Sequence, residues 1–114
     1  MVSEAQARRI LNVVAWTQLA VLADLPPGGL IEVERGEDLY ALCNVGGEIR
    51  ALWGSCPHQG GPLGEGVLTG NLVTCPWHMW EFDSGTGACS MNESLRIPVF
   101  PVKIENGAIM VDIA

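Results

Sequence analysis

A chain of 114 residues is long enough for one domain with a modest core, but too short to hold an additional catalytic domain of any size. Thirteen acidic residues against six basic ones give a net charge of −7, which argues against binding nucleic acid or an anionic membrane through a basic face. No apolar run approaches the roughly 18 residues of a membrane-spanning helix, and no signal for export begins the chain. The sequence therefore predicts a soluble, cytoplasmic protein that does not bind membranes.

We expect one domain over residues 16–114, preceded by an N-terminal extension over residues 1–15. Residues 3–14 fit an amphipathic helix with Ser3 as its N-cap, and an extra strand is the alternative.

Short segments rich in apolar and β-branched residues predict strands at 30–33, 39–45 and 49–53. The last two segments are separated by Gly46-Gly47, a dipeptide that suits a two-residue hairpin turn. The sequence is therefore typical of an all-β fold built from short antiparallel strands.

A second hairpin is predicted at the C-terminal end, where apolar segments 102–104 and 108–113 flank Asn106-Gly107. Both turn residues tolerate the positive φ angles that a type I′ turn requires. Between the two hairpins, residues 53–100 are dense in Gly, Pro, Cys, His and Trp, which predicts loops projecting from the β scaffold. We expect the chemistry of the protein to lie in these loops.

Both histidines of the chain and two of its four cysteines form two spaced pairs: Cys56-Pro-His58, then sixteen residues, then Cys75-Pro-Trp-His78. A single histidine or cysteine is more often a surface or core residue than a metal ligand. Four such residues in paired spacing indicate a metal site with one Cys and one His from each of two loops. In a chain without an export signal, this interpretation is favoured over two disulfides.

A tetrahedral zinc site is the rival metal assignment, because zinc accepts the same donors. Finger-type zinc sites, however, pair Cys with Cys and His with His on a hairpin and a helix. Here each loop supplies one of each, and no helical pattern carries the second pair.

The spacing C-x-H-x16-C-x-x-H, together with Gly60-Gly61 and the segment Trp80 to Gly85, resembles the Rieske family over about residues 30–112. The resemblance implies a fold of small antiparallel sheets whose tip holds a [2Fe–2S] cluster in loops at about 54–83, covered by a third loop. It also implies the four ligands. The two cysteines, Cys56 and Cys75, would bind one iron, and the two histidines, His58 and His78, would bind the other.

The resemblance also places the protein within the family's range of reduction potentials. High-potential members join their two ligand loops through a disulfide, and Gly61 and Trp77 stand at those positions here. The remaining cysteines, Cys43 and Cys89, are therefore expected to be free thiols. Cys43 also falls within an apolar strand pattern.

Two hydroxyl groups that donate to the cluster in high-potential members are replaced here by Trp80 and Phe82. If each such bond favours the reduced cluster by about 1.5 kcal/mol, their loss lowers the potential by on the order of 130 mV. We expect a potential below about 0 mV, at the low end of the family range.

Two further positions depart from the family pattern. Met79 follows the last ligand, where a Gly is common, so either the backbone path differs or Met79 covers the edge of the cluster. The third loop, at about 88–94, carries Met91 and Asn92 instead of proline. Trp77 and Trp80 are either docking residues or ordinary packing residues under the loops.

The resemblance implies a one-electron carrier that is not an enzyme by itself: the ferredoxin component of a multicomponent oxygenase acting on aromatic compounds. Its expected partners are a flavin-containing reductase and a terminal oxygenase. The alternatives are a small Rieske subunit of an assimilatory nitrite reductase complex and a redox-sensing module.

Overall fold

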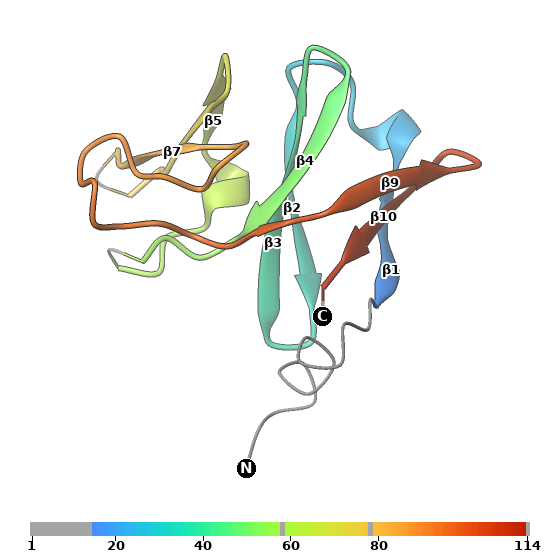
Figure 1. Cartoon of the computed structure of the whole chain (residues 1–114), viewed down its shortest axis with the longest axis horizontal. Helices are drawn as coiled ribbons and strands as arrows, with labels where there is room; N and C mark the ends of the chain where they lie inside the picture. Colours follow the sequence, from blue (N-terminus) through green and yellow to red (C-terminus); the bar gives the residue numbers. More distant parts are fainter. Residues whose placement is uncertain (1–14, 58, 78, 114) are drawn as a thin grey trace.

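The computed structural model describes residues 15–57, 59–77 and 79–113, and these residues form three antiparallel sheets (Figure 1). The strands are β1 (Trp16–Val21), β2 (Leu30–Arg35), β3 (Asp38–Val45), β4 (Glu48–Trp53), β5 (Val67–Thr69), β6 (Leu72–Thr74), β7 (Glu81–Asp83), β8 (Val99–Phe100), β9 (Val102–Glu105) and β10 (Ala108–Asp112). Two 3₁₀ turns, η1 (Leu22–Asp24) and η2 (Leu63–Glu65), join them. In the described part of the chain there is no α-helix, and so none that could cross a membrane. The predicted all-β fold is confirmed.

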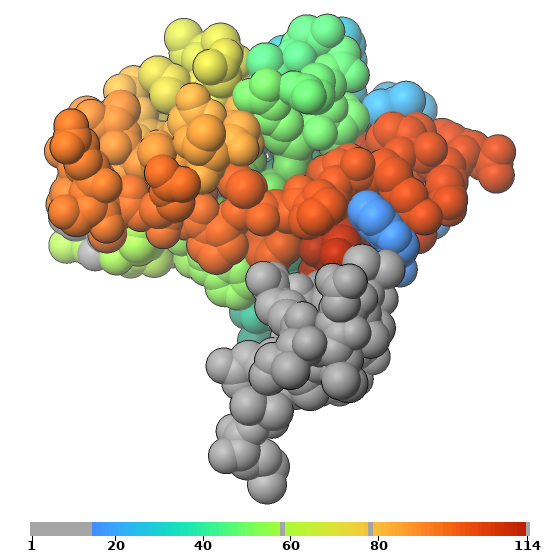
Figure 2. Space-filling model, in the orientation of Figure 1, coloured from blue at the N-terminus to red at the C-terminus, as the bar shows by residue number. Residues whose placement is uncertain are grey.

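The sheets divide the molecule into two regions. The strand orders are β1-β10-β9, β2-β3-β4-β8 and β5-β6-β7. We call the first two sheets the base, and residues 54–98, which contain the third sheet and the predicted site, the tip. In Figure 1 the tip lies to one side of the base, and in the space-filling view the chain leaving the tip crosses the front face as one continuous band into β8 and β9 (Figure 2).

Both predicted hairpins are confirmed. Gly46 and Gly47 turn with φ of 61° and 102°, and β3 pairs with β4 from Val45 and Glu48 onward. Asn106 and Gly107 turn with φ of 51° and 80° between β9 and β10, as a type I′ turn requires. The strands predicted at 30–33, 39–45 and 49–53 fall within β2, β3 and β4.

The prediction that residues 53–100 are loops is wrong in part, because β5, β6 and β7 form a sheet of their own within this segment. Each of these strands has only three residues, too few for a periodic pattern to stand out. A signal was nevertheless present. Gly70-Asn71 lies between two apolar segments as a two-residue hairpin dipeptide, and β5 pairs with β6 across it.

β1 was likewise not predicted, because its side chains are mostly half-buried and its partner β10 is at the other end of the chain. The helix or extra strand predicted for residues 3–14 lies outside the described residues.

β3 separates two hydrophobic cores. Leu42 faces the base core, where it packs with Ile109 and Val111. Ala41 and Cys43 face the opposite way into a core shared with the tip. Because successive side chains of a strand point to opposite faces, β3 is buried on both sides, and the base and the tip pack against one strand.

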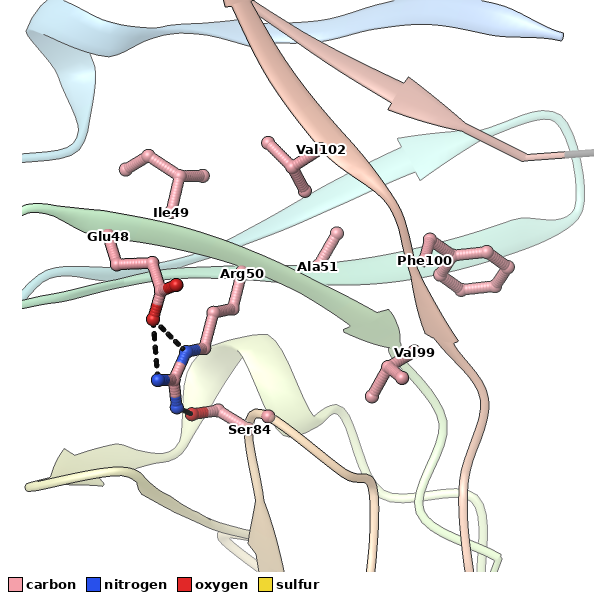
Figure 3. Close-up of a pocket in the computed structure, with 9 residues that line it drawn as sticks. Glu48, Ile49, Arg50, Ala51, Ser84, Val99, Phe100 and Val102 are labelled. Atoms are coloured by element: carbon pink, nitrogen blue, oxygen red, sulfur yellow. Dashed lines mark hydrogen bonds and ion pairs between the residues drawn. The ribbon is translucent and has the colours of Figure 1, made fainter. Parts of the chain in front are cut away.

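A polar contact also joins the two regions at the cleft of about 380 Å³ shown in Figure 3. Arg50 on β4 donates from Nη1 to Oγ of Ser84, just after β7, at 3.0 Å. Glu48 holds the other side of the guanidinium, with Oε2 2.9 Å from Nε and 2.6 Å from Nη2. Ser84 is buried, so this bond fixes the end of β7 against the base.

Candidate metal centre

Each predicted ligand pair lies in a loop that is closed by a backbone hydrogen bond. The N–H of Cys56 donates to the carbonyl of Gly61 at 2.8 Å, and the N–H of Cys75 donates to the carbonyl of Trp80 at 2.7 Å. In both loops the acceptor is five residues after the cysteine. The two loops are therefore built alike at their bases, although their Cys and His spacings differ.

The two loops bring their thiols together. Cys56 and Cys75 are 2% and 0% exposed, and neither forms a disulfide. Burial raises the pKa of the Cys75 thiol most, and the neighbouring Cys56 thiol raises it further, whereas the backbone N–H of Trp77 acts in the opposite direction. Two of the four predicted ligands are thus neighbours at the centre of the tip.

The two histidines, His58 and His78, lie outside the described residues, so their predicted role stays a prediction. The residues on either side of them are exposed: Pro57 and Gln59 in the first loop, Trp77 and Met79 in the second. We call these exposed residues the crest of each loop. The crests are at the surface, whereas the two thiols are buried.

Position 61 requires glycine because there is no room for a side chain beside the Cys75 thiol. A Cβ at this position would lie 2.7 Å from Sγ of Cys75 and 3.1 Å from Cβ of Trp77. The two positions where a loop disulfide was excluded are thus adjacent in space, with Trp77 covering Gly61. Cys43 and Cys89 are buried free thiols, as predicted.

Apolar side chains surround the thiols from below. Phe82 is fully buried in the same core as Cys56 and Cys75, and Trp80 packs against that core. These are the two positions at which the sequence lacks hydroxyl donors. The low potential stays a prediction, and the apolar surroundings agree with the absence of hydroxyl donors on which it rests.

Backbone groups at the site were not predicted from the sequence. They include the loop-closing carbonyls of Gly61 and Trp80 and the N–H of Trp77 that favours the Cys75 thiolate. The shared interval of five residues between Cys and acceptor is a signal that could have suggested the closures.

The donor set fits an iron–sulfur cluster. Two neighbouring buried thiolates repel each other and need a positive charge between them. The sequence has no Lys or Arg between Arg50 and Arg96, so neither ligand loop has a Lys or Arg that can supply it. Ferric ions supply that charge, and thiolate is a ligand they favour.

The fold and the paired thiols define a small β protein with a metal centre held by two loops. Residues 15–101 match the model of the Rieske [2Fe–2S] domain. The chain is 36% identical over 103 residues to the ferredoxin component of the naphthalene 1,2-dioxygenase system of Pseudomonas putida, covering 89% of this chain and 98% of that protein. It is 34% identical over 101 residues to the ferredoxin component of biphenyl 2,3-dioxygenase of Rhodococcus jostii strain RHA1, covering 88% and 94%.

Among solved structures, a chain in the complex of reduced oxygenase and oxidized ferredoxin of carbazole 1,9a-dioxygenase matches with a TM-score of 0.78 and 30% identity. That match covers 85% of this chain and 92% of the other. The chain belongs to the Rieske [2Fe–2S] family, and its cofactor is one [2Fe–2S] cluster.

Proposed function

We propose that Cys56, His58, Cys75 and His78 are the protein ligands of this cluster, the cysteines on one iron and the histidines on the other. The neighbouring buried thiols of Cys56 and Cys75 support the first half of this assignment. The positions of His58 and His78, each within a loop closed at its base by a cysteine N–H, support the second half.

With its cluster bound, the protein carries one electron at a time, as the ferredoxin component of a multicomponent oxygenase in the cytoplasm. Buried Cys56, Cys75 and Phe82 keep water from the sulfur side of the site. The exposed crests, including Trp77 and Met79, leave the opposite side open to a partner protein. The main observation in support of the proposal is that the cysteines are buried while the neighbouring loop residues Trp77 and Met79 are exposed.

The partners that we propose are a flavin-containing reductase as electron donor and a terminal oxygenase as electron acceptor. The naphthalene and biphenyl dioxygenase relatives, 36% and 34% identical over nearly their whole length, are ferredoxin components of such systems. Their names support an aromatic hydrocarbon as the substrate of the partner oxygenase.

The test is electron transfer in the absence of oxygen. One NADH per two chains, with a catalytic amount of flavin reductase, should bleach the oxidised protein, and addition of the oxidised terminal oxygenase of the naphthalene 1,2-dioxygenase system should reoxidise it as each electron passes to the oxygenase. Stopped-flow absorbance follows both steps. Bleaching without recovery would contradict the carrier role, and a salt-resistant complex with a sirohaem-containing chain would favour a nitrite reductase subunit instead.

A further inference from the structure

Met79 has a backbone conformation that a methionine rarely adopts. Its φ is 62°, and among the described residues only Asn106 is another non-glycine with positive φ. Asn106 lies in a hairpin turn that favours this conformation, and asparagine tolerates it well. A side chain such as that of Met79 makes the left-handed region costly, because its Cβ approaches the following carbonyl oxygen. The backbone thus follows the path expected for the Gly that is common here, but it carries a long side chain.

Nothing in the described fold compensates for this cost. The Met79 side chain is 60% exposed and belongs to neither hydrophobic core. Glycine would relieve the strain and expose less apolar surface to water. Residues kept in a costly conformation at an exposed place near a functional site are candidates for a role in binding.

The neighbourhood of Met79 indicates what it would bind. Trp77, two residues earlier, is 49% exposed, so the second loop presents two large apolar side chains to solvent. The tip as a whole is acidic, because residues 54–98 hold four Asp or Glu residues against a single Lys or Arg, the exposed Arg96. A complementary surface is therefore an apolar recess with basic side chains at its edge.

We propose that Met79 is a recognition residue for the terminal oxygenase, inserted from the crest of the second loop into such a recess. This inference rests on the carrier function proposed above. The left-handed backbone holds the side chain outward, and the flexible thioether adapts to the recess and loses its contact with water on binding. The strain in the free protein is offset only in the complex.

Three variants of the cluster-loaded protein test this inference, each titrated with the terminal oxygenase of the naphthalene 1,2-dioxygenase system. Met79→Ala keeps the strain and removes the side chain, whereas Met79→Gly removes both. Ile104→Ala is the matched control, because Ile104 is an apolar side chain of β9 in the base and is 43% exposed.

Both Met79 variants should raise the Kd for the oxygenase about tenfold, and Ile104→Ala should leave it unchanged. The melting temperature should rise by about 3 °C in Met79→Gly and stay constant in Met79→Ala. Reoxidation by ferricyanide, which needs no docking, should be as fast as in the wild type for all three.

The inference is overturned if both Met79 variants bind the oxygenase as tightly as the wild type does. It is equally overturned if Met79→Gly lowers the melting temperature, because Met79 would then stabilise the fold itself. If the wild type holds its cluster but neither binds nor reduces the oxygenase, the carrier function fails together with the inference.

Discussion

Some glycines of the tip have a different structural role from the turn glycines of the base. In the base, Gly36 and Gly46 lie in hairpin turns with φ of 62° and 61°, and a Cβ at either position would meet open space. In the tip, a Cβ at Gly66 would overlap the carbonyl oxygen of Thr74, and one at Gly87 would overlap that of Ile97. The two base glycines are needed for local backbone conformation, whereas Gly66 and Gly87 are needed because their segments lie backbone to backbone with Thr74 and Ile97.

The hairpin turns of the base are therefore determined locally, whereas Gly66 and Gly87 of the tip depend on contacts between segments. Substitutions in the tip should therefore cost more than matched substitutions in the base. Paired variants test this difference.

Cys75→Ala should abolish cluster binding, because it removes a proposed ligand at the centre of the tip. Iron content should fall from two atoms per chain to near zero, and the visible absorption should disappear. Cys43→Ala is the matched control: this buried free thiol lies on β3 behind the site, and its loss should leave iron content unchanged. Bleaching of the Cys43 variant would show that the proposed ligand set is wrong.

Gly66→Ala should lower the free energy of unfolding by about 3 kcal/mol or more, because the clash with Thr74 is with backbone and cannot be relieved by a rotamer change. Gly36→Ala, in the β2–β3 turn, should cost only about 1 kcal/mol for its left-handed backbone. Urea denaturation measures both. If both variants lost the same free energy of unfolding, the proposed difference between tip and base glycines would be wrong.

Asp83→Asn should destabilise the tip by about 1–2 kcal/mol at neutral pH. Burial acts to raise the pKa of Asp83, but hydrogen bonds outweigh it and lower the pKa below its usual 3.8. Oδ1 accepts the N–H of Gly85 at 2.7 Å and that of Thr86 at 3.0 Å. Since the folded pKa is the lower one, this stabilisation is complete above about pH 4 and is lost as the pH falls through the folded value.

Melting temperatures of the wild type and Asp83→Asn check this sign. The difference between them should be largest at neutral pH and should shrink in acid. A difference that stays constant down to about pH 2 would mean that the carboxylate charge does not stabilise the turn.

Glu32→Gln should have the smallest effect and the opposite sign. Glu32 lies on β2 beneath the tip, where a Cβ on Gly64 would lie 2.5 Å from its Cα, and its Oε1 is buried with no hydrogen-bond partner among the described residues. Burial, followed by the charges of Glu65 and Glu34, raises the pKa of Glu32 above 4.5.

Because the folded pKa is the higher one, stability falls as the pH rises from about 4.5 through the folded value and stays lower at neutral pH. Glu32→Gln should therefore raise stability at pH 7 by less than about 1 kcal/mol and leave it unchanged near pH 4. Glu37→Gln, an exposed carboxyl in the β2–β3 turn that does not contribute to the pKa shift of Glu32, is the control. A destabilised Glu32 variant at neutral pH would contradict this assignment.

The same contrast explains what could be predicted from the sequence. The turns at Gly46-Gly47 and Asn106-Gly107 were predictable because their signals are local and each dipeptide determines its own backbone. The proposed ligand pairs stand out in the sequence because Cys and His in this spacing have few other uses. The small sheet of the tip was missed because its strands are very short. The need for Gly66 could not be foreseen, because it arises from Thr74, eight residues away, and only folding brings the two together.

The position of β3 has a consequence for how the molecule opens. This strand has a partner on each edge, β2 and β4, and a core on each face. The tip can unfold locally and release its cluster while β3 stays paired, but β3 cannot separate from its neighbours without exposing both cores. The amide protons of Ala41 to Cys43 should therefore be the slowest in the protein to exchange with deuterium. Loss of the cluster and loss of the fold should be two separate events on different timescales.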